Sequence, residues 1–210
     1  TLKIYETVSG QLINKEKSCF AVASSTSTTT INRLKRITGM NHHKFPIKYL
    51  GCPLTTGRKK ICYYSDIVNK IINKIKGWHT KYLSTGGRAI LIRHILLALP
   101  IHLLSATNPP TGTLELIEKY IARFFWSGQE TGGKHHWAAW QDLCYPYNEG
   151  GASFRSLSDT CQAFQAKHWW NLRTTNSLWK EFMRAKFFYN FHPTIVQWKK
   201  GQAQSWKLLN

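Results

Sequence analysis

The segment KICYYSDIVNKIINKIKGW, Lys60–Trp78, sets the fold class of this 210-residue chain. Its apolar residues recur at intervals of three and four, which is the spacing of one face of an α-helix. They are Ile61, Tyr64, Ile67, Val68, Ile71, Ile72, Ile75 and Trp78, and Lys60, Lys70, Lys74 and Lys76 lie off their stripe. We therefore predict an amphipathic helix over residues 59–78 that buries isoleucines and presents lysines to solvent.

Further helices are predicted downstream. One covers STGGRAILIRHILLALP, residues 84–100, and should end at Pro100, because proline lacks the N–H that a helix interior needs. Another follows the NPPTG loop, and the last two cover residues 157–172 and 177–188. The helix after the loop carries Leu114, Ile117, Ile121, Phe124 and Phe125 on one face. We expect the first two helices to pack together through Ile67, Ile71, Ile75, Ile92, Ile95 and Leu99.

The first 55 residues predict short strands and one helix. Residues 11–17 alternate apolar and polar side chains, and the run SCFAVAS that follows is strand-like. A helix over residues 31–40 should be capped by the preceding serines and threonines and stopped by Gly39. Residues 45–54 are extended, with a turn at Gly51. The expected fold class is mainly α (α+β), a helical bundle with a small antiparallel β element near residues 10–20 and 45–54.

The charge of the chain is strongly one-sided. Its net charge is +19, from 29 basic and 10 acidic residues. Asp66 is the one acid of residues 17–114, against fifteen basic residues: Lys17, Arg33, Lys35, Arg36, Lys44, Lys48, Arg58, Lys59, Lys60, Lys70, Lys74, Lys76, Lys81, Arg88 and Arg93. Like charges repel, so this excess favours a polyanionic partner, of which a nucleic-acid backbone is the usual one. An anionic membrane surface and simple solubility are the alternatives.

Composition narrows the class of protein. Hydrophobic residues make up 42% of the chain, which is too apolar for disorder. The apolar run Ile95–Leu104 is interrupted by Pro100 and His102 and is too short to span a bilayer. Five cysteines without a C-x-x-C pair favour reduced thiols, most of them in the core. We expect an intracellular, nuclear chain that is neither secreted nor membrane-spanning and is a segment of something longer.

The sequence predicts no catalytic residue and no metal site. Two-metal phosphoryl transfer needs neighbouring carboxylates, and the three aspartates, Asp66, Asp142 and Asp159, are isolated. Zinc is disfavoured because His42-His43 and His135-His136 lack ligand spacing with Cys144 or Cys161. STGGR does not have the context of a nucleophile elbow.

The nine tryptophans have two interpretations. They could stack on bases. Trp126, Trp169, Trp170 and Trp179 stand at helical spacing among apolar residues, so core packing is the expectation for these four.

An ordered series of motifs carries a family resemblance. The motifs are SGQLINKEKS (residues 9–18), KYLGCPL (48–54), GWHTKYLSTGGRAILIRHILLALP (77–100), IARFFWSG (121–128), HHWAAWQDLCYPYNEGG (135–151) and AKHWWNL (166–172). Together they resemble the C-terminal part of the reverse transcriptase of plant LINE-type (non-LTR) retrotransposons. The strength of the likeness lies in the order of the series, over roughly residues 1–190.

The resemblance implies a division of the chain. Residues 1–57 correspond to the end of the palm and the primer-grip hairpin, 58–126 to a basic helical thumb-like region, and 127–210 to a connecting helical region. The chain would be a non-catalytic fragment of an RNA-directed DNA polymerase that grips a template–primer duplex through its phosphates, with the rest of the polymerase chain as its other partner. The resemblance places the catalytic acidic pair, through which the full-length family uses magnesium, upstream of Thr1.

The expected nucleic-acid-binding residues are Lys17, Tyr49, Leu50, Gly51, Lys70, Lys74, Lys76, Lys81, Arg88 and Arg93. Lys17 would match the lysine of the closing palm motif, or else be a surface lysine beside a turn. Tyr49-Leu50-Gly51 would match the primer grip, or else be an ordinary strand with a bulge. The lysine-rich helix face would follow a duplex, or else only solubilise the helix.

Other functions stay open at this point. The chain could be a generic basic helical module that binds nucleic acid, a membrane surface or a partner helix. GGASF, Gly150–Phe154, stands where the family has a more apolar run, and the family's lysine near Tyr147 is absent. These departures fit a decayed element product without a selected function.

Overall fold

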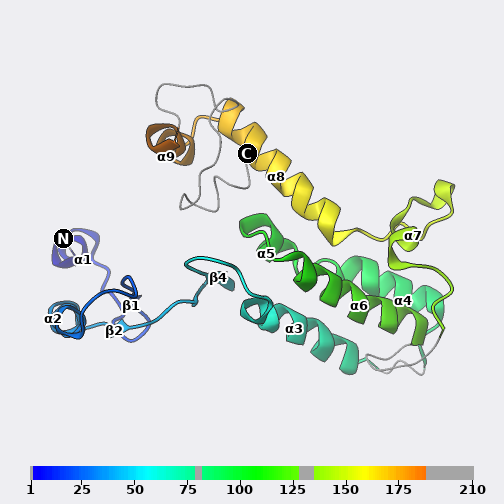
Figure 1. Ribbon diagram of the computed structural model, residues 1–210, viewed down its shortest axis with the longest axis horizontal. Coiled ribbons are helices and arrows are strands. Elements are labelled where there is room, and N and C mark those ends of the chain that lie inside the picture. Colours follow the sequence, from blue (N-terminus) through cyan, green and yellow to red (C-terminus); the bar gives the residue numbers. More distant parts are fainter. Residues whose placement is uncertain (1, 79–81, 128–134, 188–210) are drawn as a thin grey trace. The chain divides into compact units, whose positions relative to one another are not determined.

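The computed structural model describes residues 2–78, 82–127 and 135–187, and for residues 2 and 3 it describes the backbone alone. The fold is mainly helical, with a small antiparallel β element in the N-terminal region, as the sequence predicts (Figure 1). The chain divides into two compact units, Thr1–Lys59 and Lys60–Asn210. The functional labels that the resemblance attaches to its segments stay predictions.

The N-terminal unit consists of short elements. They are α1 (Leu2–Ser9), β1 (Cys19–Phe20), α2 (Thr28–Thr38), β2 (Asn41–His42), β3 (Ile47–Tyr49) and β4 (Cys52–Leu54). The predicted helix after the serine–threonine loop is α2. Its N-cap Ser27 accepts a hydrogen bond from the Thr30 N–H at 3.3 Å, and Gly39 ends it at φ 67°.

The predicted strand over residues 11–17 was wrong. These residues follow α1 as irregular chain and a turn, in which the Lys17 N–H donates to Asn14 Oδ1 at 3.0 Å and the Ser18 N–H donates to Asn14 O. Such local bonds compete with strand pairing. The β element near residues 10–20 was also expected to be antiparallel, but its strand β1 pairs with β2 in a parallel arrangement.

The second unit carries the larger set of helices. They are the 3₁₀ turn η1 (Ile61–Tyr64), α3 (Ser65–Lys76), α4 (Thr85–Leu91), the π-helical turn η3 (Ile92–Leu96), α5 (Ile101–Ala106), α6 (Thr111–Ser127), α7 (Trp140–Cys144), the 3₁₀ turn η4 (Tyr147–Glu149), α8 (Leu157–Thr174) and α9 (Leu178–Phe187). Every helix that the sequence predicts in this part is present.

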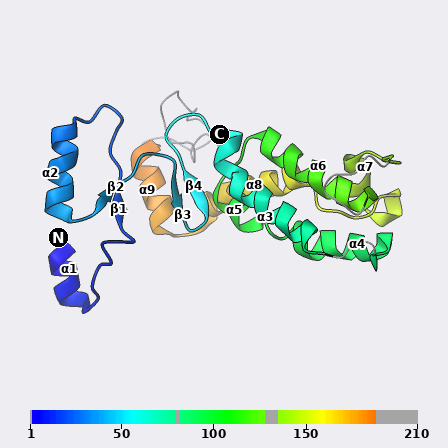
Figure 2. The ribbon, with the colours of Figure 1, turned by 90° about the horizontal axis from the view of Figure 1, so that it is seen from below.

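Helix α6 organises the core of the second unit. Its residues Ile117, Ile121 and Phe124 are almost fully buried, and both α3 and α4 pack closely against it (Figures 1 and 2). The helices predicted over residues 59–78 and 84–100 were expected to pack on each other, but α3 and α4 both pack chiefly against α6. Ile67, Ile71, Ile75 and Ile92 are buried as predicted, whereas Ile95 and Leu99 are only half-buried.

Helical structure continues past Pro100. Residues 85–106 form one helical segment, because the π-helical turn changes the hydrogen-bond spacing before the proline: the Leu97 N–H donates to Ile92 O at 3.0 Å. The expected helix end at Pro100 is confirmed only approximately: η3 ends at Leu96, turns cover residues 97–100, and α5 begins at Ile101. By length and composition this segment could cross a membrane. In the fold one side of it packs into the core, where Ile92 and Leu96 are fully buried.

The tryptophan and cysteine predictions are confirmed only in part. Trp126 and Trp169 are half-buried, but Trp170 is 65% exposed and Trp179 is 36% exposed. All five cysteines are among the described residues and are free thiols. Two of them, Cys52 and Cys161, are buried, whereas Cys19 and Cys62 are exposed.

Candidate nucleic-acid interface

Helix α3 has two chemically distinct faces. Ile67, Val68, Ile71 and Ile75 form the buried face. The outer face carries exposed lysines and asparagines: Asn69, Lys70, Asn73, Lys74 and Lys76. Because positions 69, 70, 73 and 74 recur at intervals of three and four, their side chains form one stripe along the helix. We call these five residues the α3 stripe.

The α3 stripe consists of hydrogen-bond donors. Lysine carries three N–H donors and a positive charge, and asparagine adds an amide NH₂. Asp66 is the one acid of α3 and lies in its first turn, where a carboxylate is favoured by the helix dipole. The asparagines were not among the residues predicted from the sequence, although their spacing relative to Lys70 and Lys74 was visible there. Such a surface can hold the phosphates of a nucleic-acid backbone.

Arg93 has partners inside the protein. Its Nη2 donates to the Ala152 carbonyl at 2.8 Å and to the Tyr147 hydroxyl, and its guanidinium lies 5.3 Å from the centre of the Tyr147 ring. The side chain is half-buried. Arg93 therefore ties η3 to the segment that contains η4, a contact that charge and spacing did not reveal.

The segment that Arg93 contacts depends on two glycines. Gly150 has φ 85°, a left-handed conformation that glycine adopts without strain. At Gly151 a Cβ would lie 2.0 Å from the Tyr145 carbonyl oxygen, so no other residue fits there without a backbone shift. The GG pair of GGASF thus has a structural explanation.

Arg88 is also half-buried. Its Nη2 donates to Thr85 Oγ1 at 3.1 Å, one turn earlier in α4. Arg88 and Arg93 thus differ from the α3 lysines, which are exposed. Of the predicted basic residues, Lys70, Lys74 and Lys76 are the ones that the structure gathers on one exposed face.

Tyr49, Leu50 and Gly51 lie at the tip of the β3–β4 hairpin. The strands are antiparallel with Tyr49 opposite Cys52, so Leu50 and Gly51 form a two-residue turn. Leu50 has φ 48° and Gly51 has φ 80°. Positive φ at both central residues is the requirement of a type I′ turn, which favours Asn-Gly. Leucine is an uncommon choice there, and it is 73% exposed beside Tyr49 at 62%.

The two remaining predicted residues are placed differently. Lys17 is exposed at the end of the turn that Asn14 stabilises. Lys81 lies outside the described residues. Lys17 and the hairpin tip belong to the N-terminal unit and the α3 stripe to the second, so each group is a surface of its own unit.

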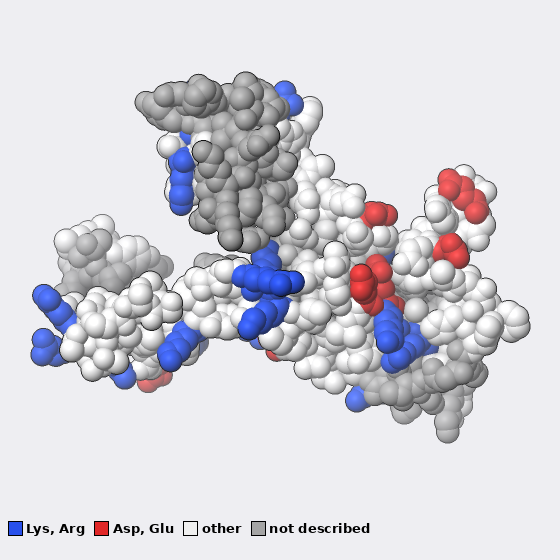
Figure 3. All heavy atoms as spheres, viewed as in Figure 1, with Lys and Arg blue, Asp and Glu red and all other residues white. Residues whose placement is uncertain are grey.

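Acidic side chains gather elsewhere in the second unit. Figure 3 shows basic groups over the connection into α3 and over α6, with acidic groups over α6 and α7. Glu115, Glu118 and Asp159 line a hollow of about 480 Å³. Glu118 accepts the Leu157 N–H at 3.1 Å and thereby caps α8, while burial raises the pKa of its carboxyl.

Metal-ligating side chains are not clustered in the described part of the chain. Among residues 2–78, 82–127 and 135–187, no three His, Cys, Asp or Glu side chains are grouped so that they could hold a metal ion. Burial raises the pKa of Cys144 to about 11, so this thiol is protonated at neutral pH.

Two proteins of Arabidopsis thaliana are similar to parts of this chain. One is named "Putative ribonuclease H protein" and is 28% identical over 125 residues, which make up 59% of this chain and 20% of that protein. The other, an "Uncharacterized mitochondrial protein", is 27% identical over 112 residues, or 52% of this chain and 71% of that protein. No protein-family model matches the chain. The match to the first relative thus spans one-fifth of its length.

Proposed function

We propose that this chain is part of a plant retrotransposon reverse transcriptase and grips a template–primer duplex through its phosphates. The observation that carries the proposal is the α3 stripe: three exposed lysines on a helix whose opposite face is buried. A net charge of +19 supports a polyanionic partner. A relative named as a ribonuclease H protein is in keeping with nucleic acid as that partner.

The α3 stripe would act by neutralising phosphates. Each lysine that replaces a counterion contributes affinity that depends on salt and not on base sequence. The exposed hairpin tip at Tyr49 and Leu50 would contact the primer strand, with Gly51 allowing close approach of a sugar–phosphate. An RNA–DNA hybrid should bind at least as well as a DNA duplex, because the contacts follow the backbone.

The 210 residues alone would not polymerise. Phosphoryl transfer by two metals needs bridging carboxylates, and lysines cannot replace them. We expect no template-dependent incorporation in a primer-extension assay with magnesium and deoxynucleotides. Incorporation by this chain alone would contradict the non-catalytic assignment.

A salt titration of duplex binding, followed by fluorescence anisotropy, tests the grip. Five or six phosphate contacts give a log–log slope of about −4.5 to −5.4. Replacing Lys70, Lys74 and Lys76 together by Gln should weaken binding to all sequences and flatten the slope by about 2–3 units. Circular dichroism checks the fold of this variant.

A matched control removes the same charge elsewhere. Lys15, Lys44 and Lys119 are exposed and lie off α3, so replacing these three by Gln should flatten the slope by less. A slope near zero for the original chain would show that the α3 stripe is only solvated. An equal effect of the two triple variants would show that net charge, and not the α3 stripe, drives binding.

A further inference from the structure

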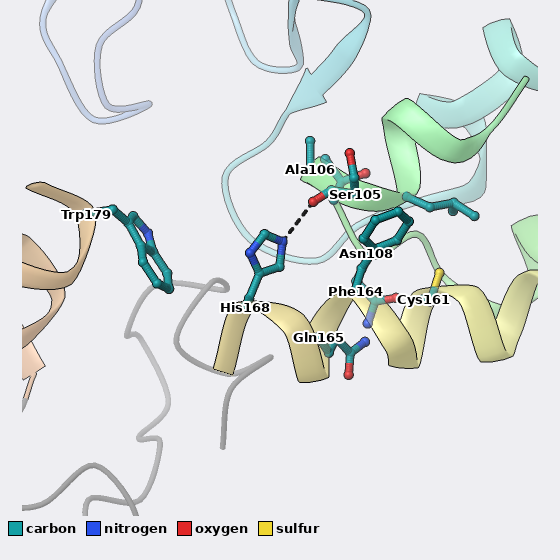
Figure 4. Close-up of a pocket in the computed structure, with 10 residues that line it drawn as sticks. Ser105, Ala106, Asn108, Cys161, Phe164, Gln165, His168 and Trp179 are labelled. Carbon is teal, nitrogen blue, oxygen red and sulfur yellow. Dashed lines mark hydrogen bonds between the residues drawn. The ribbon is translucent and has the colours of Figure 1, made fainter. Parts of the chain in front are cut away.

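A small pocket lies where the end of α5 meets α8 and α9. Its volume is about 170 Å³. Leu104 and Phe164 contribute apolar walls, Asn108, Gln165 and His168 contribute polar groups, and Trp179 of α9 completes the lining (Figure 4). The basic surface of α3 does not include any of these residues, so the pocket is a separate feature of the second unit.

His168 lines this pocket and contacts both the end of α5 and Trp179. One of its ring nitrogens, Nε2, lies 2.9 Å from the Ser105 carbonyl oxygen at the end of α5. The centres of the His168 and Trp179 rings are 6.2 Å apart, at an interplanar angle of 51°. Figure 4 shows His168 between Trp179 and the end of α5. The indole is 36% exposed, so part of its surface is open to a ligand.

The size of the pocket limits its ligand. A cavity of about 150 Å³ is known to hold benzene, and sites for drug-sized ligands begin at about 300 Å³. At about 170 Å³ the pocket has room for one ring system and not for a peptide helix. Aromatic walls favour a flat ring, and amide and imidazole groups favour a ring with donors and acceptors on its edge. A nucleobase has both properties.

The helices around the pocket are rich in basic residues. Lys167, Arg173, Lys180, Arg184 and Lys186 lie on α8 and α9, against Asp159 and Glu181. The two helices that carry His168 and Trp179 thus have a net positive charge, which favours an anionic ligand over a neutral one. A neutral aromatic ligand would gain nothing from these charges.

We propose that the pocket takes one unpaired base of a single-stranded nucleic acid, stacked on Trp179 with its edge toward Gln165. This rests on the proposed function for the class of ligand and extends it from a duplex backbone to an unstacked base. Stacking on an aromatic side chain and hydrogen bonding at the base edge are the usual ways in which proteins hold unpaired bases.

The test uses the full chain and a short single-stranded oligonucleotide with one 2-aminopurine, whose fluorescence reports stacking. Trp179→Leu should lower affinity for this strand about tenfold, which corresponds to about 1.4 kcal/mol, and abolish the fluorescence change, because the base loses its stacking partner. Gln165→Leu should lower affinity several-fold and keep the fluorescence change. Trp170→Leu is the matched control, because Trp170 is 65% exposed and lies outside the pocket lining.

Equal effects of Trp179→Leu and Trp170→Leu overturn the proposal, and so does unchanged single-strand binding by Trp179→Leu. If circular dichroism shows that Trp179→Leu is misfolded, an abasic site in place of 2-aminopurine gives the same test on the original chain. It should weaken binding about tenfold, and unchanged affinity overturns the proposal. Trp179→Leu should leave the affinity for a duplex unchanged. The triple variant of Lys70, Lys74 and Lys76 should instead change the salt dependence of duplex binding. The base-pocket proposal and the duplex-binding proposal can therefore be refuted independently.

Discussion

The two units of this chain differ in how much they bury. In the second unit Ile71, Ile92, Ile121 and Phe124 belong to one core cluster, and each is fully buried. In the N-terminal unit Cys52 is the one buried residue among the described side chains, while Val8 and Leu12 are more than 80% exposed. Burial of apolar surface is the main force that stabilises a fold. The second unit therefore has its own source of stability, and the N-terminal unit has little.

The sharpest test of this contrast replaces one isoleucine in each unit. Ile71→Ala should lower the free energy of unfolding by about 2–5 kcal/mol, because Ile71 is fully buried and alanine leaves a cavity. Ile37→Ala should change it by less than about 0.5 kcal/mol, because Ile37 is 67% exposed on α2. Urea denaturation followed by circular dichroism measures both. Equal costs would refute the contrast between the units.

A smaller effect is expected at Gly151. Gly151→Ala forces the new Cβ against the Tyr145 carbonyl, and the backbone shift should cost about 1–3 kcal/mol. Gly86→Ala is the control in the same unit: its Cβ meets no atom closer than 3.9 Å, and alanine in a helix should stabilise by about 0.5–1 kcal/mol. Thermal unfolding of the two variants should shift in opposite directions. A stable Gly151→Ala variant would mean that the loop is free to rearrange.

A substitution at the tip of the β3–β4 hairpin should change the stability of the hairpin alone. Leu50→Asn places a residue that tolerates positive φ in the type I′ turn and should stabilise the hairpin by about 1 kcal/mol. Hydrogen exchange of the hairpin amides should slow, while the unfolding midpoint of the second unit stays unchanged. A shift of that midpoint would show that the two units unfold together.

The smallest effect concerns pH. Burial raises the pKa of Glu118 in the folded chain above its unfolded value, so the folded state holds this proton more tightly. This group therefore reduces stability as pH rises from the unfolded pKa through the raised folded pKa. Glu118→Gln keeps an acceptor for the Leu157 N–H and should remove that part of the pH dependence, with a gain under about 1 kcal/mol at neutral pH. Denaturation at several pH values measures it. The same pH dependence in both chains would exclude Glu118 as its origin.

Sequence patterns predicted the second unit better than the first, for a physical reason. The spacing of apolar residues in α3 and α6 matches a hydrophobic core that lies within the second unit itself. Ile71 and Ile121 are therefore buried, as the sequence predicted. The alternation in residues 11–17 has no comparable core behind it, and Asn14 forms a turn instead. Local spacing likewise missed contacts between distant residues. Arg93 is bonded to Tyr147 and Ala152, more than fifty residues away, and its expected phosphate contact stays a prediction.

The candidate sites show the same limit. Lys70, Lys74 and Lys76 could be grouped from their spacing alone, because one helix presents them. The pocket at Trp179 could not, since α5, α8 and α9 each supply part of it. The sequence instead suggested that Trp179 and Trp170 are core residues. Which tryptophans reach the surface depends on how α8 and α9 pack, and that is a tertiary property.

The central position of α6 has a consequence for the order in which the chain is made. Helices α3 and α4 leave the ribosome before α6, yet both bury their apolar faces chiefly against it. At about 5–20 residues per second, the stretch from the end of α5 to the end of α6 takes about 1–4 s to synthesise. Throughout that interval the nascent chain exposes the apolar segment of residues 85–106, which by composition could enter a membrane. Translation speed across α6 therefore sets how long a chaperone or a membrane can compete with folding.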